Sequence, residues 1–228
     1  IDNQGNVYIL GETNNNDLWN PGGNIDVVLL KYTSTGALAW SRTFAGSSGL
    51  IDYPAGLKVD NESNIIISMN LRNTASGYDA YFMKYNPAGD SIWSRRYNST
   101  ANLDDFTNYY LTPVIDKFGN SYFSGYYRAA ANTGTDGICW KYSKNGVLEW
   151  QQTYNETSPD SNDYYSGIAI DSAGTVYCIG TVYNNSSAYD MILAKYLQPP
   201  FEPGNLNANA TSSSRINLNW LTSNVIWL

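Results

Sequence analysis

A group of residues that recurs along the chain constrains this 228-residue protein more than any other feature of its sequence. A Lys-Tyr pair returns at intervals of 53, 57 and 54 residues, and an aspartate precedes each lysine by five positions. The four pairs are Lys31-Tyr32, Lys84-Tyr85, Lys141-Tyr142 and Lys195-Tyr196, and the four aspartates are Asp26, Asp79, Asp136 and Asp190. Self-similarity at a fixed period is typical of architectures built from one repeated supersecondary unit. The sequence therefore predicts four copies of one unit.

Two turn motifs divide each unit into short strands. The first is Asp-x-x-x-Asn or a close variant, at Asp2–Asn6, Asp60–Asn64, Asp116–Asn120 and Asp171–Thr175. The second is a glycine turn that follows the Lys-Tyr pair and precedes a tryptophan, with Gly36, Gly89 and Gly146 before Trp40, Trp93 and Trp150. Apolar and aromatic segments of strand length lie between these turns. Each unit is expected to hold four strands, A to D, as in the blade of a β-propeller.

The fold class expected is all-β, because 20 tyrosines and 7 tryptophans with many Asn, Ser, Thr and Gly favour strands and tight turns. A long antiparallel sandwich is the alternative, but it gives no reason for the same residues to return once every four strands. We expect a propeller arc with blades at about residues 1–46, 52–99, 108–155 and 164–197. The first blade lacks strand A and the last lacks strand D, so the strand that completes the last blade is expected upstream of Ile1, in a larger ring.

Two parts of the chain resemble known families. Residues 171–177 and 189–196, together with the turn Asn86 to Gly89, resemble the bacterial β-propeller repeats called SBBP repeats, and the likeness spans about residues 1–197. Ser63 in place of the turn glycine and Thr112-Pro113 inside strand A depart from the pattern. After a Pro-rich linker at 198–204, residues 205–228 resemble the start of a fibronectin type III domain, with Leu206 and Trp220 in its core by that resemblance. About 25 residues are too few to bury a sandwich core, so this truncated β-sandwich segment is expected to be loosely ordered or to dock on the propeller.

Several function classes are disfavoured by composition. The net charge is −7 and no basic patch is visible, which disfavours nucleic-acid binding. No apolar stretch approaches the ~20 residues that a membrane helix needs. The chain has no histidine and no phosphate-binding glycine loop, so we expect no enzyme activity and no cofactor.

Two further features are interpreted as structural. We expect no metal, because each Asp-x-x-Gly-Asn turn offers one carboxylate where calcium takes six to eight oxygens. Cys139 and Cys178 are interpreted as core residues, and their pairing is left open.

A set of polar and aromatic residues carries the binding hypothesis. Asp52, Asn108 and Asp163 stand eight residues before the turn aspartates, and Tyr53, Tyr109 and Tyr164 follow them. If strand A lines the central channel, these groups gather at its mouth, on the face shared by the B–C and D–A loops. Trp19 and Tyr127 belong to the longest insertions on that face. The alternative is that the tyrosines only fill the tops of the blades.

The expected function is a noncatalytic binding or scaffold module of a secreted or surface-displayed bacterial protein. Loops on a rigid scaffold are where binding residues concentrate, and they would present a polysaccharide or protein partner with exposed aromatic rings. The alternative is an accessory propeller region of a larger secreted hydrolase whose catalytic domain lies outside this sequence. Other domains of the same longer chain are expected as partners in either case.

Overall fold

The structure is a computed structural model that describes residues 1–14, 24–109, 111–131, 133–155, 162–184, 188–198, 209–212, 215–217 and 225–226. Within these ranges the chain forms strands and turns and no helix, as expected for an all-β protein. No helix that could cross a membrane is found in this part of the chain.

Four antiparallel sheets follow one another along the chain, one for each predicted blade. The first sheet contains β1 (Val7–Asn14), β2 (Ile25–Tyr32) and β3 (Leu38–Phe44). The second contains β4 (Tyr53–Val59), β5 (Ile65–Asn73), β6 (Gly77–Tyr85) and β7 (Ser91–Tyr97). The third contains β8 (Asp105–Thr107), β9 (Val114–Ile115), β10 (Ser121–Tyr127), β11 (Asp136–Tyr142) and β12 (Leu148–Tyr154). The fourth contains β13 (Tyr164–Ile170), β14 (Val176–Asn184), β15 (Ala188–Tyr196) and β18 (Val225–Ile226).

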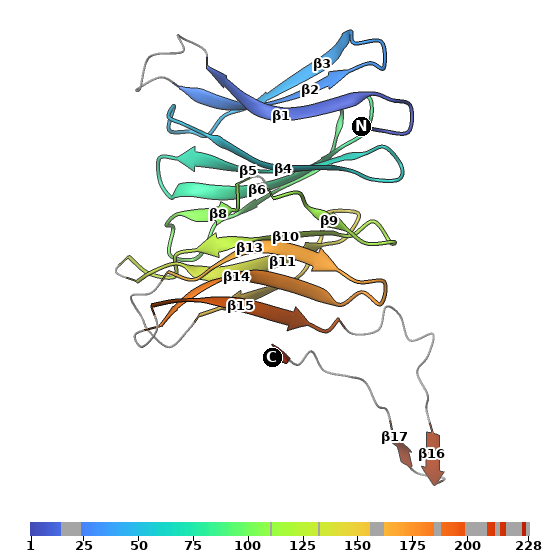
Figure 1. The fold of residues 1–228 in the computed structure, drawn as a ribbon, viewed down its shortest axis with the longest axis vertical. Helices are drawn as coiled ribbons and strands as arrows, with labels where there is room; N and C mark the ends of the chain where they lie inside the picture. The colour runs from blue at the N-terminus through green and yellow to red at the C-terminus, as the bar shows by residue number, and fades with distance from the viewer. Residues whose placement is uncertain are drawn as a thin grey trace.

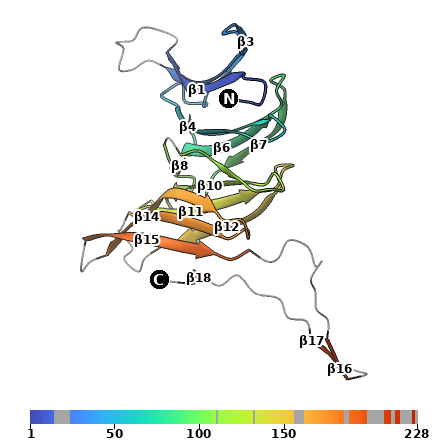
Figure 2. The same ribbon diagram turned by 45° about the vertical axis from the view of Figure 1, so that its right-hand side comes forward.

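The four sheets stack face to face in chain order, like the consecutive blades of a propeller arc (Figures 1 and 2). Equivalent strands have equivalent pairing: the Lys-Tyr strands β2, β6, β11 and β15 each pair with the strand before them. Among the described residues the first sheet has no strand A, whereas β4 and β13 fill that position in the second and fourth sheets. The predicted all-β arc of four blades is confirmed.

The hydrophobic core lies between the blades. Because side chains alternate between the two faces of a strand, successive residues of β5 serve different junctions. Ile65, Ile67 and Met69 pack on the first blade with Val27 and Leu29. The intervening Ile66 packs on the third blade in a cluster with Phe82, Phe123, Ile138 and Trp140. Both faces of an internal blade are therefore buried.

The Asp-x-x-Gly-Asn motif forms a turn whose aspartate accepts hydrogen bonds from its own turn. In the first copy, Oδ1 of Asp2 accepts from the backbone N–H groups of Gln4 and Asn6, and Oδ2 accepts from the Asn6 amide and the Tyr8 hydroxyl. Burial acts to raise the pKa of Asp2, but these hydrogen bonds outweigh it and lower the pKa to about 2. The two backbone hydrogen bonds to Oδ1 recur at Asp60, Asp116 and Asp171. This supports the interpretation of the motif as turn chemistry.

The strand D tryptophans and arginines bind the glycine turn of the next blade. The Trp40 indole N–H donates to the Pro87 carbonyl at 3.2 Å, and Nε of Arg42 donates to the Gly89 carbonyl at 3.0 Å. One blade later, Trp93 donates to the Lys144 carbonyl at 3.1 Å and Arg95 donates to the Gly146 carbonyl at 2.6 Å. These repeated residues therefore join neighbouring blades.

Strand A of the third blade is interrupted where the sequence contains Thr112-Pro113. β8 and β9 pair with opposite ends of β10, and the described residues between them belong to no strand. The backbone at Leu111 lies against the second blade, so close that a Cβ on Gly56 would clash with the Leu111 carbonyl oxygen. The amide of Asn70 bridges the same junction, because it accepts from Thr107 N–H at 2.8 Å and donates to Thr107 C=O at 2.9 Å.

The C-terminal residues give one unexpected contact. β18 pairs antiparallel with the edge of β15, at Lys195↔Ile226 and Tyr196↔Val225, which is the strand D position of the fourth blade. We expected that strand upstream of Ile1. β16 (Asn209–Ser212) and β17 (Arg215–Asn217) form a two-stranded sheet of their own. Leu206 and Trp220 lie outside the described residues, and the likeness to a fibronectin type III domain stays a prediction.

The two cysteines are free and fully buried. Both belong to the core between the third and fourth blades, together with Tyr122 and Tyr165. Burial and then the neighbouring Cys178 thiol raise the pKa of Cys139 well above its usual value. Their role as core residues agrees with the sequence interpretation.

Candidate functional site

A pocket of about 440 Å³ opens between the third and fourth blades. Its lining combines three aromatic rings with amide, hydroxyl and charged groups, namely Asp104, Phe106, Asn108, Tyr126, Arg128, Thr135, Asn162 and Tyr164. These residues come from the start of β8 and β13, the end of β10 and the loops beside them. They therefore lie on the face that the B–C and D–A loops share, where the sequence predicted a site.

The pocket is one end of a row of aromatic rings that crosses three blades. Ring centroids are 5.5 Å apart for Tyr53 and Tyr78, and 4.8 Å apart for Tyr78 and Phe106. The row continues to Tyr126 at 5.2 Å and to Tyr164 at 6.4 Å. Each distance lies in the range of favourable ring contacts. A continuous aromatic strip therefore leads from the second blade into the pocket.

Tyr109 and Arg72 flank this row. The edge of the Tyr109 ring meets Tyr53 at 5.2 Å, and 38% of Tyr109 is exposed. The Arg72 guanidinium lies 5.3 Å from the centre of the Tyr78 ring. Burial first, and then the neighbouring Tyr53, raise the pKa of Tyr78 to about 12, so its hydroxyl keeps its proton at neutral pH.

Polar groups around the pocket include two donors whose acceptor is missing. Nε of Arg128 and Nδ2 of Asn108 are buried and have no hydrogen-bond partner among the described residues. Other groups are occupied: Asp104 Oδ1 accepts from Tyr78 N–H at 2.9 Å, and Asn162 Oδ1 accepts from Thr135 N–H at 3.1 Å. The lining therefore combines aromatic faces with polar side chains, two of which have a buried nitrogen without a partner among the described residues.

The predicted site residues separate into groups. Asn108 and Tyr164 line the pocket, and Tyr53 and Tyr109 belong to the aromatic row. Trp19 lies outside the described residues. Asp52, Asp163 and Tyr127 have other roles.

Asp52 and Asp163 are buried and hold backbone groups, so the hypothesis that they contact a ligand is corrected. The Asp52 carboxylate accepts from Gly46 N–H at 2.7 Å and from Arg72 N–H at 2.6 Å. Asp163 accepts in the same way from Tyr183 N–H at 2.9 Å. Their exposed fractions are 1% and 0%. Each of them binds the end of strand B in its own blade, and Asp52 also holds the D–A loop at Gly46.

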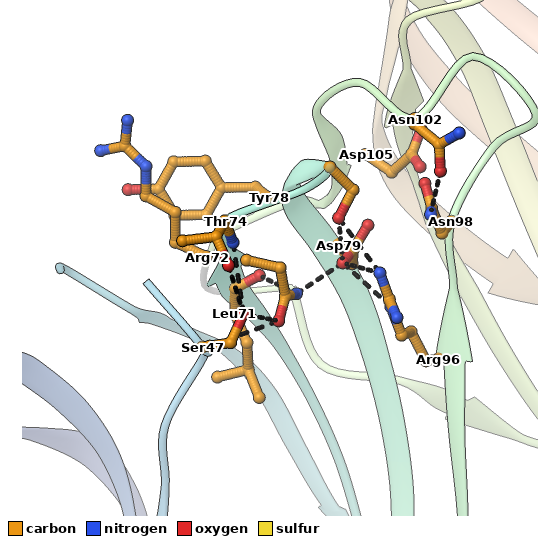
Figure 3. Close-up of polar contacts among 12 residues, drawn as sticks. Ser47, Leu71, Arg72, Thr74, Tyr78, Asp79, Arg96, Asn98, Asn102 and Asp105 are labelled. Carbon is orange, nitrogen blue, oxygen red and sulfur yellow. Dashed lines mark hydrogen bonds and ion pairs between the residues drawn. The ribbon is translucent and has the colours of Figure 1, made fainter. Parts of the chain in front are cut away.

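The equivalent residue in the third blade is Asp105 and not Asn108. Asp105 accepts from Ser99 N–H at 2.6 Å, six residues earlier, as Asp52 accepts from Gly46. The sequence predicts this residue eight positions before the turn aspartate, which gives Asn108 when counted from Asp116. Strand A of this blade has three extra residues, so the equivalent residue is Asp105. Figure 3 shows Asp105 near Asp79, whose carboxylate is bound by Arg96 at 2.8 Å.

Tyr127 lies on the wrong face of β10 to reach the pocket. Adjacent residues of a strand point to opposite faces, so Tyr126 faces Tyr164 while Tyr127 packs against the core shared with the second blade. The hydroxyl of Tyr127 is hydrogen-bonded to Asp136. The assignment of Tyr127 to the site is therefore corrected to its neighbour Tyr126.

Sequence reasoning missed Phe106 and Tyr78 in this strip. Phe106 directly follows Asp105, as Tyr53 follows Asp52 and Tyr164 follows Asp163. An alignment of the blades on Asp-aromatic pairs would have found it.

No protein family and no curated protein matches the sequence. The structure is similar to a crystal structure of a protein of unknown function from Bacteroides caccae, at 12% sequence identity and a TM-score of 0.40. That match covers 74% of this chain and 55% of the Bacteroides protein.

Proposed function

We propose that this protein is a noncatalytic extracellular binding module that holds a polysaccharide in the pocket between its third and fourth blades. The observation that carries the proposal is the aromatic row from Tyr53 to Tyr164, which ends in a pocket rimmed by amide and guanidinium donors. Such a display suits a secreted or surface-bound bacterial protein of the SBBP-repeat type, which the sequence resembles.

The chemistry of the lining favours a sugar. A sugar ring has an apolar face that stacks on an aromatic ring and hydroxyls that need hydrogen-bond partners, and Tyr and Trp side chains serve both needs. Tyr126 and Tyr164 offer the rings, while the Arg128 guanidinium and the Asn108 amide bring polar groups to the same lining. A volume of 440 Å³ is within the range of ligand pockets, which is about 300 to 1,000 Å³.

The proposal does not include catalysis because of the carboxyl groups that the pocket lining contains. Glycoside hydrolysis generally uses two carboxyl groups on opposite sides of the bond that breaks. Among the described residues of the lining there is one carboxylate, Asp104, and Oδ1 of Asp104 is already bound by Tyr78 N–H. We therefore assign binding without turnover to this pocket.

Binding of the purified chain to arrays of bacterial and plant polysaccharides tests the proposal. We expect Tyr164→Ala to weaken binding about tenfold or more, because a stacked ring contributes roughly 1–3 kcal/mol. Tyr189→Ala is the matched control, since Tyr189 is 61% exposed on the same blade but lies outside the pocket. Equal losses in both variants, or binding to protein arrays alone, would contradict a sugar site at this place.

A further inference from the structure

We infer that the outer face of the fourth sheet is a docking surface for strand A of another blade of the same repeat. This inference is independent of the polysaccharide pocket. The pocket lies between the third and fourth blades, whereas the inference concerns the face of β14 and β15 that is turned away from the third blade. It is drawn from a comparison of this face with the three junctions inside the structure.

The three junctions between neighbouring blades are all built from the same strands. Strand A of the following blade packs against strands B and C of the blade before it: β4 lies on β1 and β2, β8 on β5 and β6, and β13 on β10 and β11. β14 and β15 are strands B and C of the fourth blade and have the same pairing as β5 and β6. Their outer face therefore has the backbone of a junction surface.

The side chains of this face are also those of a junction. Leu193 is equivalent to Leu29, Phe82 and Cys139, which the next blade buries completely, yet 42% of Leu193 is exposed. Met191 is equivalent to Val27 and Ala80, which are fully buried, yet 78% of Met191 is exposed. The face thus keeps apolar residues at positions that elsewhere form the core.

Two more exposed apolar side chains complete the patch. Ile179 is 43% exposed and Tyr189 is 61% exposed, and with Met191 they line a hollow of about 380 Å³. Contiguous apolar patches of this kind on a protein surface mark interaction sites. The continuity with three established junctions identifies what kind of partner fits here.

The partner expected is a strand that begins with an aspartate and an aromatic residue. All three strands A that occupy a junction begin this way, as Asp52-Tyr53, Asp105-Phe106 and Asp163-Tyr164. Each of these aspartates lies near the strand C aspartate of the blade before it: Asp52 near Asp26, Asp105 near Asp79 and Asp163 near Asp136.

A five-blade protein tests the inference. A duplicate of residues 156–197 is inserted after Leu197, with the methionine of the duplicate replaced by leucine. The rate of oxidation of each methionine by peroxide is then read by peptide mass spectrometry. We expect oxidation of Met191 to slow by about tenfold or more, toward the rate of the buried Met83, because buried groups react only through transient opening.

Leu193→Asp is the control substitution, and it is made in both proteins. In the four-blade chain the aspartate would be exposed and the melting temperature should stay unchanged. In the five-blade protein it should restore rapid oxidation of Met191. Unchanged oxidation of Met191 in a five-blade protein whose duplicate shows protected amides in hydrogen exchange would overturn the inference. So would protection of Met191 in the four-blade chain that rises with protein concentration, since the occupant would then be a second copy.

Discussion

The carboxylate of Asp105 lies near enough to that of Asp79 for their charges to repel each other across the junction of the second and third blades. Both side chains are fully buried, and Oδ1 of each has no hydrogen-bond partner in the described part of the chain. Arg96 neutralises Asp79 through Oδ2. Asp105 is compensated by hydrogen bonds from Ser99, including the one from its backbone N–H at 2.6 Å.

The pairing of Asp105 with Asp79 predicts that the free energy of unfolding falls as the pH rises toward neutral. Burial, followed by the charges of Asp79 and Asp104, raises the pKa of Asp105 from 3.8 to about 7 against the Ser99 hydrogen bonds. Between these values the folded state binds more protons than the unfolded state. The free energy of unfolding therefore contains a contribution that is complete below about pH 4 and is lost by about pH 7, of at most roughly 4 kcal/mol.

Asp105→Asn should remove that contribution to the pH dependence. Urea unfolding at pH 5 and pH 8 measures it as the difference between parent and variant. The difference is needed because the pKa values of Asp2 and Asp60 are lowered, and these groups change stability in the opposite sense at acid pH. Parallel curves for the two proteins would show that Asp105 is ionised in the folded state at both pH values.

The glycine turns predict an unequal cost for one substitution. Gly36 and Gly146 both have positive φ, at 85° and 76°, so alanine should cost about 1 kcal/mol at either from backbone strain. A Cβ on Gly146 would also lie 2.5 Å from Cγ of Trp93, whereas a Cβ on Gly36 would meet nothing within 4 Å. Gly146→Ala should therefore cost about 1–3 kcal/mol more than Gly36→Ala. Equal midpoints in denaturant would contradict a tight contact between Trp93 and this turn.

Asn70 should contribute strongly to the attachment of β8. Its amide satisfies both backbone groups of Thr107 in a fully buried place, so Asn70→Leu would leave a donor and an acceptor unpaired. We expect a loss of about 2–3 kcal/mol in the free energy of unfolding and faster amide exchange at Thr107. Asn61→Leu, at an exposed turn position, serves as the comparison and should change neither measurement.

The two thiols should be inert in the folded protein. Cys139 and Cys178 have no exposed surface, and the pKa of Cys139 is raised. A thiol reagent should label neither cysteine in native buffer and both after denaturation, because only an accessible thiolate reacts. Labelling under native conditions would indicate that the junction of the third and fourth blades opens.

The sequence predicted the blades well because the repeated residues act between blades. Trp40 and Trp93 return at equal spacing since each must reach the same turn carbonyl in the following blade. The pairing of β18 with β15 was not predicted. Only two residue pairs make it, and so short a segment has no repeated pattern in the sequence.

The candidate site could be predicted only in part. A count of residues placed Asn108 at the position of Asp105, because three additional residues in strand A shifted the register without altering the motif that follows. Tyr127 was chosen over Tyr126 because the sequence does not tell which of two adjacent tyrosines faces the pocket. The location of the site was easier to predict, since the loops at one end of every blade converge on one face.

The hydrogen bonds of Trp40 and Arg42 end on carbonyl oxygens of the main chain, which every amino acid possesses. The contact therefore requires the shape of the neighbouring glycine turn and almost nothing of its side chains. Gene duplication could add, remove or reorder such units, because each new neighbouring blade would offer the same main-chain carbonyl oxygens. Loops at the opposite end would then be free to diverge, and ligand preference could evolve blade by blade.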